Sequence, residues 1–386
     1  MRVLPLLALC VLVLASASAQ APLVPCSLRV AYVEPLRRQP AASGTIFADE
    51  LTAPPDRSRY LEYFDCNGSF VFDAQGGMAG GAMRAHFNKG QVEAGNLKVL
   101  FGRNPFGRGK QITDTFTDVW WRVYVKHERG WEGDPAKLAR LTCLAGTDWS
   151  QGFIAHVWTG KNHALCIDPA TGIRDSRKVT TKYNDFANLH WLGAHNTAMP
   201  MFTPAESGRW VCVESHVKLN TPGHADGVFQ LWIDGKLEAE ATGLDWQGNW
   251  TDYAADAFFL ENYWNDGAVK DESRWFSDLV ISTQPIGPVT AAAAPRFTVV
   301  ATSQGAWQAE VSSSPDHDAV VWQSRVMDPS VTQTAISSSG GAFHGAPAGT
   351  HSLTPGATYW LRLREKLPDG SWSAWSPWHA PFKVAG

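Results

Sequence analysis

The stretch Trp210–Lys236, WVCVESHVKLNTPGHADGVFQLWIDGK, has the pattern of a long β-hairpin. Apolar and polar residues alternate from Trp210 to Leu219, and Val228–Asp234 alternates in the same way. Successive side chains of a strand point to opposite faces of a sheet, so each strand has one apolar face and one face that mixes aromatic and ionisable residues. The segment Asn220–Gly227 contains Pro-Gly and Asp-Gly, which are typical of turns. One face of this hairpin therefore belongs to a core, and the other face is a candidate for function.

The same period of two recurs along most of the chain, and helical periodicity is nearly absent. In Val119–Lys126, four apolar residues alternate with Trp120, Arg122, Tyr124 and Lys126. Further strands are expected at Ser69–Asp73, Ala82–Phe87, Asn96–Phe101, Ala139–Leu144, Gly152–Thr159, His163–Ile167, Asp256–Trp264 and Arg274–Ser282, with an irregular segment at Asp168–His190. Many short strands separated by turns predict an all-β sandwich or jelly roll.

Residues 1–19, MRVLPLLALCVLVLASASA, have an early positive charge, an apolar run and small residues at the end. This is the pattern of a secretory signal peptide, with cleavage expected after Ala19. The apolar run is short for a membrane span, and no second stretch of that kind follows. We therefore expect a protein that is secreted or periplasmic, has no membrane span and is a monomer.

The composition narrows the class of protein. The chain has 386 residues, which is enough for two domains with a substantial core. It contains 18 tryptophans, while charged residues make up 18%, so an aromatic-rich β protein is favoured over a helical or disordered one. The formal net charge of −4 makes a nucleic-acid partner unexpected, and any site for a polyanion requires a local cluster of basic residues.

Five cysteines follow the expected signal peptide. In an oxidising compartment most cysteines pair, and an odd number leaves one thiol over. We predict the pairs Cys26–Cys66 and Cys143–Cys166, with Cys212 as a free buried thiol. The scattered spacing of these residues is not that of a zinc site.

A change of composition at Thr283–Pro295, TQPIGPVTAAAAP, indicates a linker. The expected organisation is a signal peptide at 1–19, an N-terminal arm at 20–66, a jelly-roll domain at 67–284, a linker at 285–295 and a compact second β domain at 296–386. The chain is thus expected to contain two separate β units.

The second β domain resembles a fibronectin type III domain. Within residues 353–378, LTPGATYWLRLREKLPDGSWSAWSPW, the LTPG turn and the tyrosine after it match the corner before a late strand of that family, and WSAWS matches the WSxWS box of some members. Arg362 and Arg364 share one face of their strand, so they are expected to interleave with Trp372 and Trp375 as a cation–π ladder. We interpret the ladder as structural, and such domains usually serve as spacers or adhesion modules.

The large domain resembles the concanavalin A-like jelly roll of secreted polysaccharide lyases of the heparin- and glucuronan-lyase type. The resemblance spans Ser69–Ser282 and is carried by the hairpin with its W-x-D-G end, by FFLENYW and by SRWFSDLVIST. It implies a concave sheet whose outward face forms a groove for an extended glycan. The residues expected to line this groove, because they lie opposite the apolar faces, are Arg84, His86, Trp120, Arg122, Tyr124, Lys126, His156, Trp158, Glu214, His216, Lys218, Glu261 and Tyr263.

This mixture of side chains suits an acidic polysaccharide, because aromatic rings stack on sugar faces and basic side chains pair with carboxylates or sulfates. It also suits β-elimination. In that reaction a cationic group neutralises the uronate carboxyl, a tyrosine or histidine removes the adjacent proton, and an acid protonates the leaving oxygen. We predict that Arg122 and His156 neutralise the carboxyl. Tyr124 or Tyr263 would act as base and acid, with His216 as the alternative.

Two other functions can be compared with a lyase. A retaining glycoside hydrolase needs two carboxylates roughly 5–5.5 Å apart. Jelly-roll glucanases supply them from a Glu-x-Asp-x-x-Glu strand, which this chain lacks, and Glu214 is the one carboxylate on its strand. A glycan-binding protein without catalysis needs only the groove and remains the alternative function. The same polar residues could also lie on a convex, solvated face, where the alternation would look identical.

No cofactor is required by this chemistry, although Asp245, Asp252 and Asp256 are candidates for a structural calcium site. The segment Ile154-Ala155-His156 departs from the Gln-Ile/Val-His signature of alginate lyases. The sequence thus predicts a secreted protein that binds an acidic polysaccharide, with cleavage by β-elimination favoured over hydrolysis.

Overall fold

The structure is a computed structural model that describes residues 23–37, 44–78, 81–300, 305–314, 316, 318–379 and 381–385. The expected signal peptide, with its cleavage position after Ala19, lies outside the described residues. The described chain is almost entirely β-structure, with one short 3-10 helix, η1 (Arg57–Arg59). This confirms the predicted all-β class. Within these ranges, no helix has the length and apolar character needed to cross a membrane.

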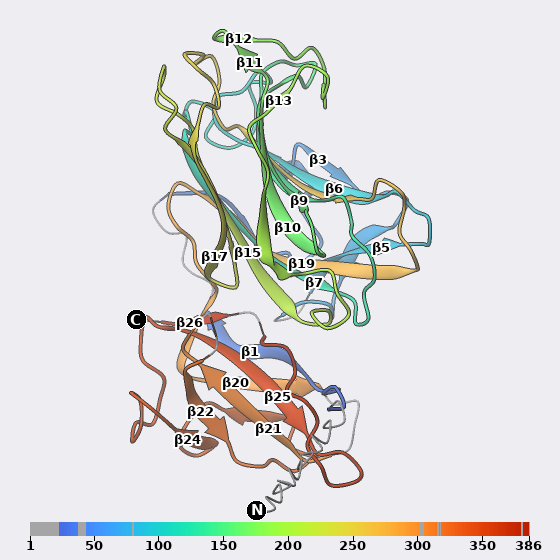
Figure 1. The fold of residues 1–386 in the computed structure, drawn as a ribbon, viewed down its shortest axis with the longest axis vertical. Helices are drawn as coiled ribbons and strands as arrows, with labels where there is room; N and C mark the ends of the chain where they lie inside the picture. The colour runs from blue at the N-terminus through green and yellow to red at the C-terminus, as the bar shows by residue number, and fades with distance from the viewer. Residues whose placement is uncertain are drawn as a thin grey trace, which may run out of the picture.

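The upper unit in Figure 1 is a jelly-roll-like sandwich of two eight-stranded antiparallel sheets. The first, which we call the hairpin sheet, has the order β17-β16-β15-β7-β19-β5-β4, with β2 added beside β19. Its strands are β2 (Thr45–Asp49), β4 (Phe70–Asp73), β5 (Ala82–Phe87), β7 (Asp118–His127), β15 (Trp210–Lys218), β16 (Gly227–Ile233), β17 (Lys236–Leu244) and β19 (Glu272–Ser282).

The second sheet, which we call the facing sheet, has the order β13-β10-β9-β8-β18-β6-β3, with β14 added beside β10. Its strands are β3 (Glu62–Phe64), β6 (Glu93–Leu100), β8 (Lys137–Leu144), β9 (Gln151–Thr159), β10 (Ala164–Thr171), β13 (His190–Trp191), β14 (His195–Pro200) and β18 (Ala257–Tyr263). After β10 the chain forms a small two-stranded ribbon of β11 (Ile173–Arg174) and β12 (Arg177–Lys178).

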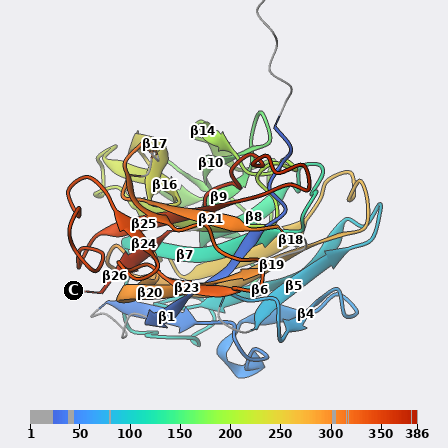
Figure 2. The same cartoon turned by 90° about the horizontal axis from the view of Figure 1, so that it is seen from below.

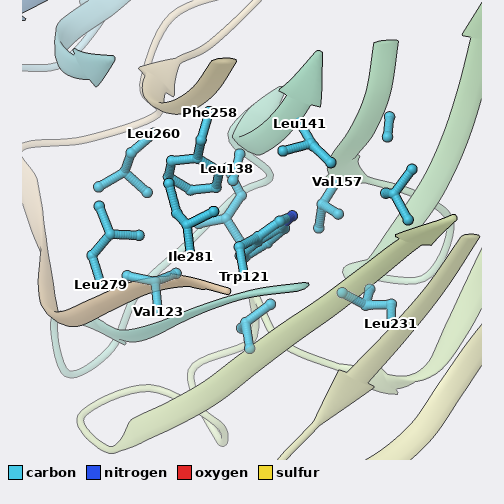
Figure 3. Close-up of a cluster of buried hydrophobic side chains, with 14 of the residues drawn as sticks. Trp121, Val123, Leu138, Leu141, Val157, Leu231, Phe258, Leu260, Leu279 and Ile281 are labelled. Carbon is cyan, nitrogen blue, oxygen red and sulfur yellow. The ribbon is translucent and has the colours of Figure 1, made fainter. Parts of the chain in front are cut away.

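An apolar core fills the space between the two sheets (Figure 3). Trp121, Val123 and Ile281 of the hairpin sheet pack against Phe258 and Leu260 of the facing sheet, and all five are fully buried. The rings of Trp121 and Phe258 lie 5.2 Å apart. Because each such side chain contributes about 1.5–3 kcal/mol when it leaves water, this core is the main source of stability for the sandwich.

The predicted hairpin is confirmed. Strands β15 and β16 pair in antiparallel register from Val213↔Ile233 to Lys218↔Val228, and the alternate valines of β15 are buried in the core. The chain then turns at Asp234-Gly235 into β17, a strand that the sequence pattern does not predict. Its sequence, KLEAEATGL, contains no aromatic residue and no valine or isoleucine, which are the residues that favour strands.

The lower unit in Figure 1 contains eight strands in the order β1-β20-β26-β25-β21-β22-β24, with β23 beside β20. They are β1 (Arg29–Arg37), β20 (Thr290–Val300), β21 (Trp307–Ser312), β22 (Val320–Ser324), β23 (Gln333–Ala335), β24 (Gly341–Phe343), β25 (Thr358–Glu365) and β26 (Phe382–Val384). We call it the C-terminal unit, and its membership of the fibronectin type III family stays a prediction.

The N-terminal segment and the linker differ from the expected organisation. Residues 20–66 are not a free arm, because β1 pairs with β20 of the C-terminal unit while β2 and β3 join the two sheets of the sandwich. Figure 2 shows β1 beside β20. Residues 285–295 are not wholly a linker either, since β20 begins at Thr290. The runs of apolar alternation in these segments are too short to be recognised alone, and pairing to distant strands determines their structure.

The predicted cation–π ladder of the C-terminal unit is confirmed. The Arg364 guanidinium lies 4.5 Å from the ring centroids of both Trp372 and Trp375. Arg362 lies 4.7 Å from Trp375 and 4.4 Å from Trp378, which extends the ladder by one ring. Alternating rings and guanidinium groups therefore attach the segment after β25 to that strand.

The predicted disulfides do not form, because all five described cysteines are free thiols. Cys143 points into the core, whereas Cys166 lies on the outer side of the same sheet, between two residues that face the core. Cys26 belongs to the core of the C-terminal unit, while Cys66 lies in the sandwich between β3 and β4. The prediction that Cys212 is a free buried thiol is confirmed.

Candidate functional site

The predicted site residues are divided between two opposite outer faces of the sandwich. The outer face of the hairpin sheet, called the hairpin face, carries Arg84, His86, Trp120, Arg122, Tyr124, Lys126, Glu214, His216 and Lys218. The outer face of the facing sheet, called the cleft face, carries His156, Trp158, Glu261 and Tyr263. The expectation that they line one groove is wrong, because alternation places a residue on one side of its own sheet and does not say which sheet that is.

The C-terminal side of the molecule covers part of the hairpin face. Arg122 is 4% exposed and donates a hydrogen bond from Nη1 to the Gly287 carbonyl oxygen at 2.7 Å. The carboxylate of Glu214 accepts hydrogen bonds from the amides of Ile286 and Gly287, both at 2.9 Å. Arg122 and Glu214 therefore use these hydrogen bonds to hold the connection to the C-terminal unit.

Tyr124 is fully buried beneath the same connection. Its hydroxyl accepts a hydrogen bond from the Val289 amide at 2.9 Å and donates one to the Pro381 carbonyl oxygen at 3.3 Å. Burial raises the pKa of Tyr124 well above its ordinary value. This tyrosine therefore cannot act as the predicted base. Trp120 and His216 lie half-buried on the part of the face that remains open.

Lys126, Arg84 and His86 occupy the other end of the hairpin face. The Lys126 ammonium lies 4.9 Å from the Trp210 ring and 4.7 Å from the Trp275 ring. Arg84 is the neighbour of Trp275 in the pairing of β5 with β19, and His86 bonds to a serine of β19 at 3.0 Å. Lys126 and His86 thus have partners within the sheet, whereas the Arg84 Nε is buried without a hydrogen-bond partner.

The cleft face contains a cleft of about 960 Å³. It is lined by residues of β6, β8, β9 and β18, together with the segments around residues 183–191 and 264–269. Trp158, Glu261 and Tyr263 line it, and the fully buried His156 stacks against Trp158. The structure therefore brings together four of the predicted site residues in a cleft of a size typical for ligands.

A row of stacked rings, called the aromatic stack, forms one wall of this cleft. The rings of His156 and Trp158 lie 4.1 Å apart and are nearly parallel, at 5°. Trp191 follows at 5.6 Å from Trp158, and Phe186 at 6.1 Å from Trp191. Trp191 and Phe186 are 36% and 45% exposed. Exposed ring faces in a cleft are suited to stack on the apolar faces of sugars.

A buried group of charges forms the floor of the cleft. Arg140 is completely buried and donates from Nη2 to Glu261 Oε1 at 2.8 Å and from Nη1 to Asn184 Oδ1 at 2.8 Å. Its Nη2 also donates to the Tyr183 hydroxyl. The Lys137 ammonium lies 3.8 Å from Glu261 Oε1. One carboxylate therefore meets two cations here, which leaves positive charge available to an anionic ligand.

The environment determines the charge of each group. Burial acts to raise the pKa of Glu261, but Arg140, Lys137 and Lys98 outweigh burial and hold that pKa below its ordinary value. Burial lowers the pKa of Lys137 by more than Glu261 raises it. Burial, with Arg140 and Lys137 beside it, holds the pKa of His156 well below its ordinary value. His156 is therefore neutral and does not supply the predicted positive charge, which comes from Lys137 and Arg140.

Two tyrosines line the cleft near these charges. The Lys137 ammonium lies 4.5 Å from the ring centroid of Tyr263, whose hydroxyl makes no hydrogen bond within the described part of the chain. The Tyr183 hydroxyl, which accepts from Arg140, lies 3.4 Å from Glu261 Oε1. Burial raises the pKa of Tyr183 despite the nearby Arg140. Tyr183 therefore keeps its proton, whereas Tyr263 is open to a ligand.

A buried arginine supports the floor from the opposite sheet. Arg274 of β19 points into the sandwich and is completely buried. Its Nη2 donates to the carbonyl oxygens of Glu261 at 2.6 Å and Lys137 at 2.9 Å, and its Nε donates to Asn262 Oδ1 at 2.7 Å. Nη1 has no hydrogen-bond partner, and burial lowers the pKa of Arg274 to about 9. Arg274 thus fixes the main chain under two residues of the cleft.

Sequence reasoning missed Lys137, Arg140, Tyr183 and Asn184. Arg140 lies opposite the apolar face of the predicted strand Ala139–Leu144, so the same alternation argument could have found it. Tyr183 and Asn184 lie in the segment expected to be irregular, where no periodicity indicates which side chains face the cleft.

The residues that the structure describes do not form a metal centre. In the described ranges, no group of three or more His, Cys, Asp or Glu side chains is arranged to hold a metal ion. Asp245 accepts from a main-chain amide at 2.7 Å, and Asp252 accepts from the Trp250 indole at 3.0 Å. Asp256 is fully buried and accepts from a main-chain amide at 2.7 Å, and burial raises its pKa well above the ordinary value. Each aspartate thus has a separate local partner.

No family model matches the chain, and no curated protein is significantly similar to it in sequence. Among solved structures, the chain is similar to an alginate lyase from Aplysia kurodai, with 15% identity, a TM-score of 0.43, and coverage of 62% of this chain and 99% of that one. It is also similar to an endo-β-1,4-glucuronan lyase from the fungus Trichoderma reesei, with 12% identity, a TM-score of 0.43, and coverage of 62% and 96%.

An alginate lyase from a Chlorella virus is similar at 13% identity and a TM-score of 0.39, with coverage of 58% of this chain and 99% of that one. Because these identities and TM-scores are low, we base the function of this chain on the residues of its own cleft.

Proposed function

We propose that the protein binds an acidic polysaccharide in the cleft and cleaves it by β-elimination. The observation that supports this is the position of Tyr263 and Tyr183 beside Lys137 and Arg140, at one end of a cleft whose wall is the aromatic stack. Uronate chains offer sugar faces for the rings and carboxylates for the cations, so one ligand would satisfy both parts of the cleft.

The proposed roles follow from the environment of each side chain. Lys137 pairs with the uronate carboxyl group and so acidifies the proton on the adjacent carbon. Tyr263, whose hydroxyl has no hydrogen-bond partner in the described part of the chain, removes that proton. A double bond forms to the neighbouring carbon as the bond from that carbon to the leaving oxygen breaks, and Tyr183 donates its proton to that oxygen. Arg140 positions Tyr183, and the reaction requires no cofactor.

A glycoside hydrolase is disfavoured by the state of Glu261. The surrounding cations hold its pKa below the ordinary value, whereas a general acid requires a raised pKa. Glycan binding without catalysis is the second candidate, and one observation favours it. Two of the cations, Arg140 and Lys98, are already paired within the protein, since Arg140 bonds to Glu261 and Lys98 bonds to Glu62 at 2.6 Å.

The test is to mix the chain from Gln20 onward with alginate, glucuronan, heparin, chondroitin sulfate and pectate, with and without calcium. An increase in the ultraviolet absorbance of unsaturated uronate ends would identify a lyase. Tyr263→Phe should lower kcat by roughly 10²-fold or more while leaving affinity for the polymer nearly unchanged. Tyr253→Phe, the same change at a half-buried tyrosine outside the cleft, is the control.

The other outcomes of this experiment distinguish the lyase from the non-catalytic glycan-binding protein. Polymers that are retarded in a gel without any cleavage would support the non-catalytic alternative. If no polymer is either cleaved or retarded, the cleft does not bind acidic polysaccharides and the proposal is wrong. Secretion, which the N-terminal sequence predicts, is checked separately by sequencing the mature N-terminus.

A further inference from the structure

A second aromatic cluster lies on the open part of the hairpin face, on the opposite side of the sandwich from the cleft. The rings of Trp120 and His216 are stacked at 4.1 Å with an interplanar angle of 10°, and Trp120 lies 5.0 Å from Trp232. These side chains come from the three adjacent strands β7, β15 and β16, and all three are half-buried. Their position makes a platform of rings that is partly open to solvent.

Polar side chains border this platform, and the one lysine of β15, Lys218, is paired with Asp118 in the register of β15 with β7. His216 Nε2 lies 2.8 Å from Asp118 Oδ1, and His216 Nδ1 lies 2.9 Å from Gln230 Oε1. The Gln230 amide nitrogen donates to Glu240, and both Asp118 and Glu240 are exposed. The border therefore presents carboxylate and amide oxygens, which accept hydrogen bonds from hydroxyl groups.

The platform continues into a hollow of about 470 Å³ between the sandwich and the C-terminal unit. Its walls include Trp120, Trp232 and, from the C-terminal unit, Trp360, whose indole donates to the Asp234 carbonyl oxygen at 3.1 Å. Among its described lining residues, Glu214 is the one carboxylate and there is no lysine or arginine. Since both oxygens of Glu214 already accept main-chain amides, the hollow offers ring faces and no positive charge.

We propose that this hollow and its platform form a second glycan site, which takes a neutral sugar chain. Three indole groups suit the apolar faces of sugar rings, and the acceptors along the border suit their hydroxyl groups. A uronate chain would meet the carboxylates of Asp118 and Glu240, whereas β15 supplies only the ammonium of Lys218 beside Asp118, so the excess of negative charge disfavours it. The cleft, with Lys137 and Arg140, has the opposite preference.

The C-terminal unit is part of this site, because Trp360 and Thr358 line the hollow. Neither the sandwich nor the C-terminal unit alone would contain all of its walls. The site therefore gives the C-terminal unit a role in ligand binding, in which the protein attaches to a neutral polysaccharide through one face while the cleft on the other face remains open.

The test is calorimetric titration of the chain from Gln20 onward with cellohexaose, xylohexaose and mannohexaose, and with a hexamer of glucuronate for comparison. At least one neutral oligosaccharide should bind, and Trp232→Ala should weaken its binding about tenfold. Trp232→Phe keeps a ring and should restore most of the affinity. Phe64→Ala, at a 39% exposed aromatic residue on the edge of the other sheet, is the matched control.

Two results would overturn the proposal. One is that none of the three neutral oligosaccharides binds, and the other is that Trp232→Ala binds as tightly as the unmodified protein. Thermal unfolding of each variant shows whether it is folded, and if Trp232→Ala is not, the comparison is made with Glu240→Lys. Because Glu240 is exposed, this substitution should leave the fold intact, weaken the binding of the neutral oligosaccharide and allow the glucuronate hexamer to bind. Unchanged affinities for both ligands would count against the site. Because this site is separate from the cleft, its failure leaves the proposed lyase function untouched.

Discussion

Each of the two outer faces of the sandwich contains a basic side chain beside a tyrosine, in different surroundings. On the hairpin face, the Arg122 guanidinium lies 5.5 Å from the Tyr124 ring, and on the cleft face the Lys137 ammonium lies 4.5 Å from the Tyr263 ring. The Tyr124 hydroxyl has two main-chain partners, whereas that of Tyr263 has none in the described chain. A cation beside a tyrosine is therefore structural on one face and a candidate for chemistry on the other, and what covers the face makes the difference.

The largest expected effect comes from removing the hydroxyl of each tyrosine. Tyr263→Phe should reduce kcat by roughly 10²-fold or more, because the proposed base is lost. Tyr124→Phe should leave kcat unchanged and lower the free energy of unfolding by about 1 kcal/mol or more, because the Val289 amide loses its acceptor. Steady-state kinetics and denaturant unfolding separate the two effects, and equal losses of kcat would remove the distinction between the faces.

A smaller effect is expected from Arg274, which links the hairpin sheet to the floor of the cleft. Arg274→Met leaves three buried acceptors without donors and should lower the free energy of unfolding by about 1–3 kcal/mol. It should also lower kcat about tenfold with little change in KM, because Lys137 and Glu261 lose their support. Arg274→Lys should restore part of the kcat.

Arg122→Met, on the hairpin face, is the matched control for Arg274, because it removes a buried arginine that is not near the cleft. It should destabilise the protein without changing kcat. If Arg274→Met behaves in the same way, Arg274 is a structural residue and does not position the cleft.

Two carboxylates, one on each face, should respond to pH in opposite directions. The pKa of Glu214 is raised by burial, despite the Ile286 amide and Arg122, so its contribution to stability declines as pH rises above its ordinary value of 4.5. The pKa of Glu261 is lowered, so its contribution is present above 4.5 and is lost as pH falls through the folded pKa. Unfolding free energies of Glu214→Gln and Glu261→Gln measured against pH should show opposite slopes relative to the unmodified protein.

The smallest effect is expected from the ion pair between Lys98 and Glu62 at the edge of the cleft. Glu62 is 37% exposed, so water screens the pair and Glu62→Gln should change the free energy of unfolding by less than about 1 kcal/mol. The same change should leave Lys98 free to pair with a uronate carboxyl and should tighten polymer binding slightly. A lower affinity of the Glu62→Gln variant for the polymer would instead show that Glu62 takes part in binding it.

The sequence predicted those features that depend on neighbouring residues. The hairpin and the inward valines of β15 follow from strict alternation, and the ladder of Arg362 and Arg364 follows from their shared face. The positions of Trp158, Glu261 and Tyr263 opposite the core follow from the same rule. The local pattern was sufficient because each of these features depends only on which face of a single strand the side chain occupies.

Other features depend on how distant segments meet. Alternation could not separate Tyr124 from Tyr263, because strand order decides which sheet each strand joins. It could not show that Cys143 and Cys166 point to opposite sides of one sheet. Tyr183 reaches the cleft from an irregular segment, where Arg140 and not a repeating pattern determines its place.

The pairing of β1 with β20 has a consequence for the biosynthesis of the chain. The first described strand belongs to the same unit as the last one, so the sandwich is an insertion within the chain of the C-terminal unit. During translation β1 stays without its partner strand until β20 (Thr290–Val300) has left the ribosome, by which point all the strands of the sandwich, which end at Ser282, have been made. The sandwich can therefore fold before the C-terminal unit is complete. It also has the topology of a domain inserted into another domain, an arrangement that tolerates exchange of the inserted part.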